Sequence, residues 1–268
     1  MDEKRKVVVL AAVFFGLIAL AAGVYFIFFS DGRPNVPEKI QAQAPAVKET
    51  ESVPDQTPVF PATSLDNSDD LIRKLSRELS TNPRLDAWLQ SKDLVRKITA
   101  AVDNIADGLS PAKQIDFFVP DGKFEVFNIG PTEYLDPKSY ERYNLPVEVF
   151  VSFDPKETVR YFRGLKQLFQ DAYKELGYPN KDFDQTLKKA LVELLETPVV
   201  EGDIRLEKKV KTYAFADPKL EGLSEAQKHF LRLGPGNVGA VQIKLREMAL
   251  AMGVPADQIP RPRAYSTR

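Results

Sequence analysis

The sequence contains no cysteine, and this absence excludes several kinds of chemistry. Without cysteine there are no disulfides, thiolate nucleophiles, cysteine-ligated zinc ions or iron–sulfur clusters, and the chain suits any redox compartment. Histidine is almost as scarce, because His229 is the only one among 268 residues. A histidine-based triad or a two-histidine metal site within one chain is therefore excluded. We expect no catalytic residues, no metal ion and no cofactor.

A continuous basic region is also missing. The formal net charge is -1, and lysines and arginines alternate with acids over most of the chain. Nucleic-acid-binding domains usually display a basic patch that contacts phosphates, so we expect no nucleic-acid partner. The acids are concentrated between residues 31 and 70, where eight of them accompany three cations.

Only one apolar run is long enough to span a bilayer. Residues 7–29 read VVVLAAVFFGLIALAAGVYFIFF and contain neither a charged residue nor a proline. At 1.5 Å per residue, a helix of this length matches a hydrocarbon core about 30 Å thick. The run predicts a single transmembrane helix that contacts the lipid bilayer.

Basic residues 4–6 directly precede the apolar run. By the positive-inside tendency, residues 1–6 are cytoplasmic, and the remaining domain faces the periplasm from a bacterial inner membrane. A cleaved signal peptide is the alternative, because Ala19 and Ala21 provide a small-residue cleavage site. Cleavage there would leave residues 24–29 as an apolar new N-terminus, which favours the uncleaved anchor.

Small residues form one stripe along the predicted transmembrane helix. They are Ala12, Gly16, Ala19 and Gly23, at spacings of four, three and four. Such a stripe lets a second helix approach closely, which makes these residues a candidate helix–helix contact in a homodimer. Small residues are also common in membrane helices that do not associate.

The chain then divides by composition. Residues 30–64 are rich in proline and acids, with little apolar periodicity, and predict a disordered linker. Residues 65–254 predict a mainly helical soluble domain, α+β at the margin. Residues 255–268 lack a periodic apolar face, and we expect a loose basic tail.

Apolar periodicity predicts most of the helices of the domain. The first begins at the capping residues 67–70 and ends at residues 82–83, a short one covers residues 84–89 around Trp88, and a longer one lies between Ser91 and Gly108. The others cover residues 139–153 with an interruption near Pro146, 155–176, 182–196, 224–233 and 238–252. The widest apolar face belongs to residues 155–176, which we expect to form the central helix. Residues 204–215 alternate with period two and predict a small antiparallel β-hairpin, whereas residues 110–135 predict a long ordered loop.

Four stretches resemble a known bacterial family. They are residues 99–104, 169–179, 215–218 and 227–235. Their order and spacing resemble a membrane-tethered family catalogued as domain of unknown function thirty-fourteen, over roughly residues 71–252. The resemblance implies the architecture of one N-terminal helix, a proline-rich stretch and a domain. It implies no activity, ligand or catalytic residue.

Residues 234–237 read Gly-Pro-Gly-Asn and separate two predicted helices. Unpaired backbone N–H groups at such a corner bind phosphate or carboxylate, and two cations lie close in sequence. The candidate anion-binding corner consists of Lys228, Arg232, Gly236 and Asn237. A Gly-Pro turn between two helices also forms without any ligand.

The first functional hypothesis is a non-enzymatic interaction or scaffold module of the cell envelope that binds another envelope protein. The alternative is a hydrolase of envelope polymers with paired carboxylates, for which Asp171 with Glu175 and Asp182 with Asp184 are candidates. Acids at such spacing also occur on solvated helix faces.

Overall fold

The computed structural model describes residues 57–80, 82, 85, 89–114, 122–210 and 212–267. The predicted cytoplasmic N-terminus, the transmembrane helix with its small-residue stripe, most of the linker and the helix around Trp88 lie outside these residues. Within the described ranges, no helix is long and apolar enough to cross a membrane. The predictions for residues 1–56 therefore stay predictions.

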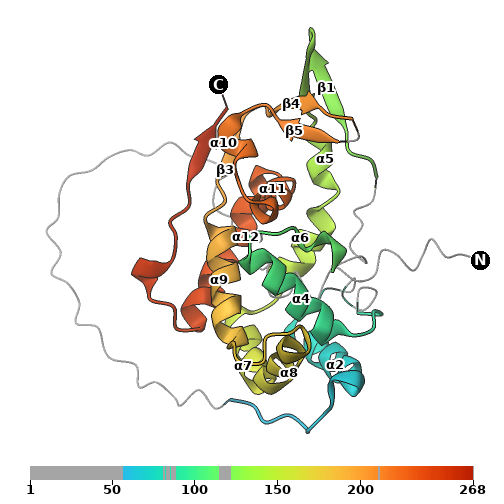
Figure 1. Ribbon diagram of the computed structural model, residues 1–268, viewed down its shortest axis with the longest axis vertical. Coiled ribbons are helices and arrows are strands. Elements are labelled where there is room, and N and C mark those ends of the chain that lie inside the picture. Colours follow the sequence, from blue (N-terminus) through green and yellow to red (C-terminus); the bar gives the residue numbers. More distant parts are fainter. Residues whose placement is uncertain are drawn as a thin grey trace, which may run out of the picture.

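The described part is mainly helical with a small antiparallel sheet, as expected. Its α-helices are α2 (Asp69–Leu79), α4 (Leu94–Ala106), α5 (Lys138–Glu141), α6 (Asn144–Val151), α7 (Pro155–Gly164), α8 (Lys166–Glu175), α9 (Phe183–Leu195), α10 (Pro218–Glu221), α11 (Glu225–Leu231) and α12 (Pro235–Ala251). Short 3-10 turns are η3 (Leu65–Asn67), η4 (Pro111–Lys113) and η5 (Ala256–Gln258). Figure 1 shows the sheet at one end of the molecule and α2, α7 and α8 at the other.

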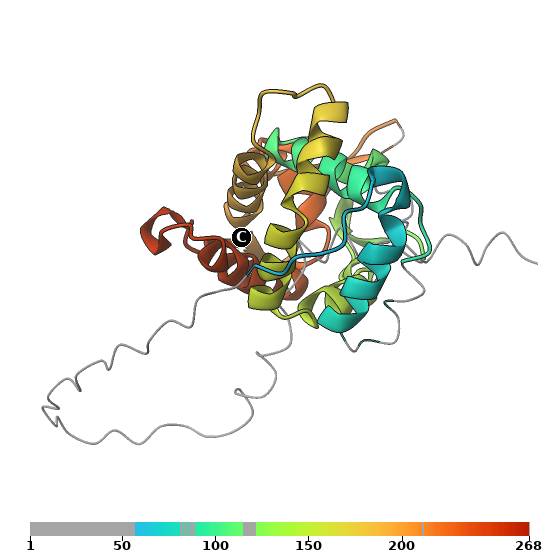
Figure 2. The same ribbon diagram turned by 90° about the horizontal axis from the view of Figure 1, so that it is seen from below.

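Helix α4 is the centre of the main core. Its residues Leu94, Ile98, Val102 and Ile105 are buried at the predicted spacing, and α4 packs against α8 and α9 (Figure 2). Full burial of such a side chain contributes roughly 1.5–3 kcal/mol. The central helix is therefore α4, and the expectation that residues 155–176 play this role is wrong.

Residues 155–176 form two helices instead of one. Helix α7 ends at Gly164 and α8 begins one residue after Leu165. On either side of the break, Phe162 of α7 and Phe169 of α8 both pack against the ring of Phe183 in α9. Their ring centroids lie 6.3 and 5.6 Å from that of Phe183. Glycine weakens a helix at this point, and aromatic packing then stabilises the bend.

The start of the described chain packs on α7. The Phe60 ring meets the Tyr161 ring edge to face at 5.5 Å. A Cβ atom on Gly164 would lie 2.5 Å from the Pro58 carbonyl oxygen and 2.6 Å from the Phe60 ring. Part of the stretch assigned to the linker is therefore in contact with the domain, and Gly164 provides the space.

The four-stranded sheet has the order β1-β2-β4-β5 and is antiparallel throughout. Its strands are β1 (Val126–Ile129), β2 (Thr132–Leu135), β4 (Arg205–Lys208) and β5 (Tyr213–Phe215). The predicted hairpin is confirmed as β4 and β5, with Leu206 opposite Phe215. The prediction of a loop over residues 110–135 is wrong for residues 126–135, which form the hairpin of β1 and β2. The hairpin turns at Gly130, whose φ of 58° is a conformation that glycine adopts readily.

The C-terminal tail forms β6 (Ala264–Ser266), which pairs in parallel with β3 (Val199–Glu201). Ile259 is buried in the main core, and the hydroxyl of Tyr265 donates a hydrogen bond to Asp217. The expectation of a loose tail is therefore wrong. Its anchoring groups pair with residues far away in sequence, which local periodicity does not reveal.

Two prolines explain shifted helix boundaries. Pro146 lies in the first turn of α6, where its missing N–H has no helical partner to lose, so the interruption falls at residues 142–143 instead. Pro235 is the first residue of α12, a position that proline favours, and the last helix begins there rather than at residue 238.

Candidate functional site

A groove of about 790 Å³ lies between the sheet and helix α11. We call it the sheet groove. Its walls combine aromatic and charged side chains: Phe124, Leu135, Arg142, Tyr143, Leu206, Lys209, Thr212, Tyr213, Ala214, Phe215, Glu221, Glu225, Lys228 and Arg232. The rings of Phe124 and Tyr213, with centroids 5.6 Å apart, pack against each other in its wall.

Lys228 is neutralised inside the groove. Its Nζ lies 3.1 Å from Glu221 Oε1 and 2.8 Å from Glu225 Oε1. The other oxygen of Glu221 accepts the backbone N–H of Phe215 at 2.9 Å. Burial pushes the pKa of Glu221 upward, but the Phe215 N–H and Lys228 outweigh it and lower the pKa. This part of the groove has no spare positive charge for a ligand.

Arg142 and Arg232 supply the free positive charge. The Arg142 guanidinium lies over the rings of Phe124 and Tyr143, at 5.9 and 5.3 Å from their centroids, and its Nε donates to the Ser139 carbonyl at 2.9 Å. Among the described residues, neither arginine has a carboxylate partner.

Both arginines act on the same phenol. Burial raises the pKa of Tyr143, and the charges of Arg142 and Arg232 each act to lower it. Arg142, directly after α5, and Arg232, at the end of α11, line the same groove as this buried ring. Paired guanidiniums next to aromatic faces suit carboxylate or phosphate groups.

The structure separates the residues of the predicted anion-binding corner. Lys228 and Arg232 line the sheet groove, but Gly236 and Asn237 do not. The Asn237 side chain donates to Asn144 Oδ1 at 3.0 Å and to a backbone carbonyl. Gly234 has a φ of 86°, and a Cβ atom there would lie 2.4 Å from Tyr140. The Gly-Pro turn thus has a packing role of its own.

Sequence reasoning missed Arg142 as the partner of Arg232. The neighbouring aromatic residues of the stretch Tyr140–Tyr143 are a local signal for an arginine that stacks on rings. No local signal connects this stretch with α11, because the two arginines are 90 positions apart in the sequence.

The predicted carboxylate pairs are engaged in ion pairs and helix caps. Hydrogen bonding to Lys174 lowers the pKa of Asp171, and hydrogen bonding to Arg96 lowers the pKa of Glu175. The Asp182 side chain caps α9, and Asp184 pairs with a lysine one turn later. A glycosidase acid needs a raised pKa, so Asp171 and Glu175 do not fit that role.

The groove contains its own carboxylate pair. Glu221 and Glu225 lie within about 6 Å of each other, because both contact the same Lys228 nitrogen. The Phe215 N–H and the Lys228 charge lower the pKa of Glu221, and Glu225 pairs with the same lysine. This arrangement favours ion pairing over proton donation.

His229 is half-buried on α11. Its Nδ1 lies 3.2 Å from Ser110 Oγ. Burial, assisted by the charge of Arg232 and opposed by Glu225, lowers its pKa to about 4. In the part of the chain that the structure describes, no cluster of histidine and acidic residues could hold a metal ion.

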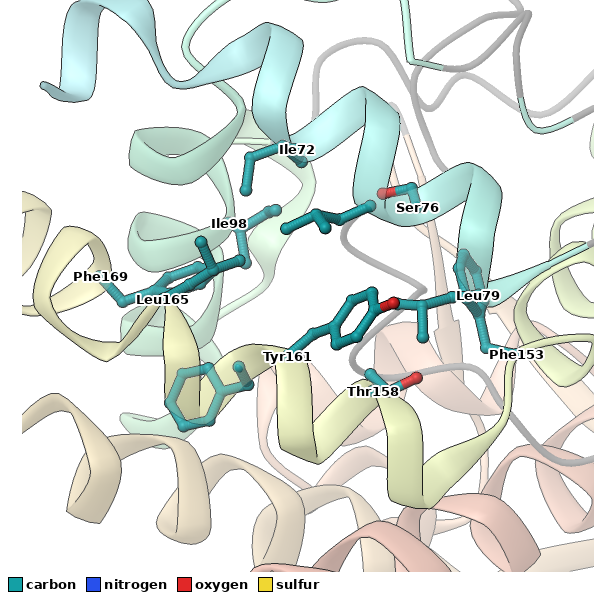
Figure 3. Close-up of a pocket in the computed structure, with 11 residues that line it drawn as sticks. Ile72, Ser76, Leu79, Ile98, Phe153, Thr158, Tyr161, Leu165 and Phe169 are labelled. Atoms are coloured by element: carbon teal, nitrogen blue, oxygen red, sulfur yellow. The ribbon is translucent and has the colours of Figure 1, made fainter. Parts of the chain in front are cut away.

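A second pocket lies between α2 and α7, with α4 and α8 behind it. Figure 3 shows Ser76, Thr158 and Tyr161 around the opening, among apolar side chains. Its volume is about 60 Å³, less than half that of an engineered cavity of about 150 Å³ that binds benzene. This pocket is therefore a packing gap and does not rival the sheet groove.

These features define a mainly helical α+β domain that carries a mixed basic and aromatic groove. The chain belongs to the family described as protein of unknown function, DUF3014, whose profile matches residues 94–249. The matched range includes Arg142, Tyr143, Lys228 and Arg232, which line the groove. No curated protein and no solved structure matches the chain.

Proposed function

We propose that the protein is a membrane-anchored, non-enzymatic interaction module of the bacterial cell envelope, and that the sheet groove is its partner-binding site. The observation that carries the proposal is the pair Arg142 and Arg232, both without a carboxylate partner among the described residues, in a groove with an aromatic wall. Charged and aromatic residues of this kind dominate the affinity of protein interfaces.

The location rests on the sequence. The apolar run at residues 7–29 and the basic residues before it support an inner-membrane anchor with the domain in the periplasm. The binding role is also supported by the lowered pKa of Glu221, because a carboxyl with a lowered pKa is poorly suited to donate a proton in hydrolysis.

Topology is tested first. A reporter that becomes active only outside the cytoplasm, fused after Arg268, should be active, and a reporter that functions only inside should not. The reverse pattern would remove the envelope location.

Binding is tested in cells with a photo-crosslinking amino acid at Thr212, an exposed residue in the groove. The matched control is Lys74, an exposed residue on α2. We expect a crosslinked envelope protein or a crosslinked second copy from Thr212 only, and a loss of the product when Arg142 and Arg232 are both changed to Gln. Equal crosslinking from both positions would contradict the proposal.

A further inference from the structure

The sheet groove carries positive charge, whereas the chain directly before and at the start of the domain is acidic. From residue 49 to residue 72 the sequence contains six acids and no lysine or arginine. Residues 49–55, Glu-Thr-Glu-Ser-Val-Pro-Asp, carry three of these acids together with a valine and a proline. We infer that the sheet groove binds residues 49–55 of a second copy of the chain, with Arg142 and Arg232 holding their carboxylates.

The groove accommodates such a segment. Its volume of about 790 Å³ is that of a ligand site for several side chains. The arginines can each form a bidentate pair with a carboxylate, and the rings of Phe124 and Tyr213 offer an apolar surface to valine and proline. Lys228 does not compete for the ligand, because Glu221 and Glu225 hold it.

The occupant comes from a second copy because Asp55, the last acid of the segment, cannot reach its own groove. Pro58 and Phe60 lie against α7, so Asp55 is within about 11 Å of that point. Helix α9 runs from the α7–α8 end of the domain to the groove. Phe183 at its start packs on α8, and Glu193 near its end accepts a hydrogen bond from Ser224 at the start of α11. With 13 residues, α9 is about 20 Å long.

Figure 1 shows the same arrangement, with α7 and α8 at one end and α11 with the sheet at the other. Two copies that exchange these segments reciprocally form a closed dimer. The inference rests on the proposed function, because anchoring in one membrane raises the effective concentration of each segment for the neighbouring groove.

The absence of cysteine allows a clean crosslinking experiment with the full chain in liposomes. Two differently tagged variants, Glu51→Cys and Thr212→Cys, are reconstituted together under mild oxidation. We expect a disulfide between the two chains, and little product when Lys74→Cys replaces Thr212→Cys. A disulfide that forms only within one chain carrying both substitutions would overturn the second-copy assignment.

Affinity is measured in parallel with a peptide of residues 46–57 and the full chain. Arg142→Gln or Arg232→Gln should weaken binding about tenfold, because each removes a charge-assisted contact. Lys74→Gln should leave the affinity unchanged. The Arg142→Lys and Arg232→Lys variants keep the charge and should bind with intermediate affinity, which separates loss of contact from loss of folding.

Further probes identify other occupants. Binding of inorganic phosphate or of anionic vesicles, without binding of the peptide, would overturn the inference, as would equal affinity for a peptide with Glu49→Gln, Glu51→Gln and Asp55→Asn. If Thr212 crosslinks another envelope protein while the peptide does not bind, the proposed function stands and this inference fails.

Discussion

Asp69 caps a helix other than its own: its carboxylate accepts the backbone N–H of Leu94 at 2.9 Å, and also that of Asp93 at 2.9 Å. It thereby joins the start of α2 to the start of α4, the central helix. Asp69→Ala should lower the free energy of unfolding by about 1–2 kcal/mol, because two N–H groups at a helix start lose their acceptor.

The control for this prediction is Asp70→Ala. The Asp70 side chain is 96% exposed and pairs only at the surface with Arg73, so its loss should change stability by less than about 0.5 kcal/mol. Urea unfolding of both variants provides the comparison. If Asp69→Ala and Asp70→Ala lower the free energy of unfolding equally, Asp69 acts through its charge alone and not as a cap of α4.

We expect that a substitution that fills the apolar pocket of Figure 3 stabilises the folded protein. Ser76 lies beside the 60 Å³ gap and is buried. Ser76→Val places two methyl groups toward the gap and should raise the free energy of unfolding by about 0.5–2 kcal/mol, as cavity-filling substitutions do. Ser76→Ala is the control, since it removes the hydroxyl without filling the space. A stabilisation equal in both variants would assign the effect to the lost hydroxyl.

Gly164 and Gly239 form a matched pair of helical glycines with opposite expected effects. Gly164→Ala drives a Cβ atom into Pro58 and Phe60 and should cost about 1–3 kcal/mol, as overpacking does. Gly239, in α12, has no atom within 4 Å of an added Cβ, and Gly239→Ala should stabilise by about 0.5–1 kcal/mol.

Limited proteolysis at Phe60 distinguishes local from global effects of Gly164→Ala. Faster cleavage there, with an intact remainder, is expected if the substitution releases the segment from α7. Unchanged cleavage would mean that the contact adapts to the methyl group.

The sequence predicts helices well where caps and apolar spacing agree within one segment. Asp182 at the start of α9 and the inward Leu187, Leu191 and Leu194 are local signals of this kind, and the structure confirms them. The capping box of Ser224 and Gln227 at α11 is another. In these elements the nearest neighbours in the chain already determine the conformation.

Features that depend on distant partners escaped prediction. Strand β6 exists because Val199 N–H donates to the Arg263 carbonyl at 2.8 Å and the flanking pairs follow. The β1–β2 hairpin was obscured by the glycine and proline residues around its turn. The sequence names Lys228 and Arg232 as candidates for an anion-binding corner, but it does not show that Glu221 in α10 pairs with Lys228 or that Arg142 lines the same groove as Arg232.

The lowered pKa of His229 should make the stability of the protein depend on pH. Its pKa in the folded protein is lowered from 6.5 to about 4, so the folded state favours the neutral ring. Stability is therefore complete above pH 6.5 and falls as the pH drops from 6.5 toward 4, by about 2–3 kcal/mol.

Because it is the only histidine in the chain, an NMR titration of its ring measures this pKa directly. A midpoint near 6.5 would contradict the prediction. His229→Gln should flatten the free energy of unfolding between pH 6.5 and 4.5, since the variant has no imidazole to protonate. Arg232→Gln should raise the pKa of His229, because the guanidinium disfavours the protonated ring, and this shift would place the groove arginine beside the histidine by a measurement independent of any partner.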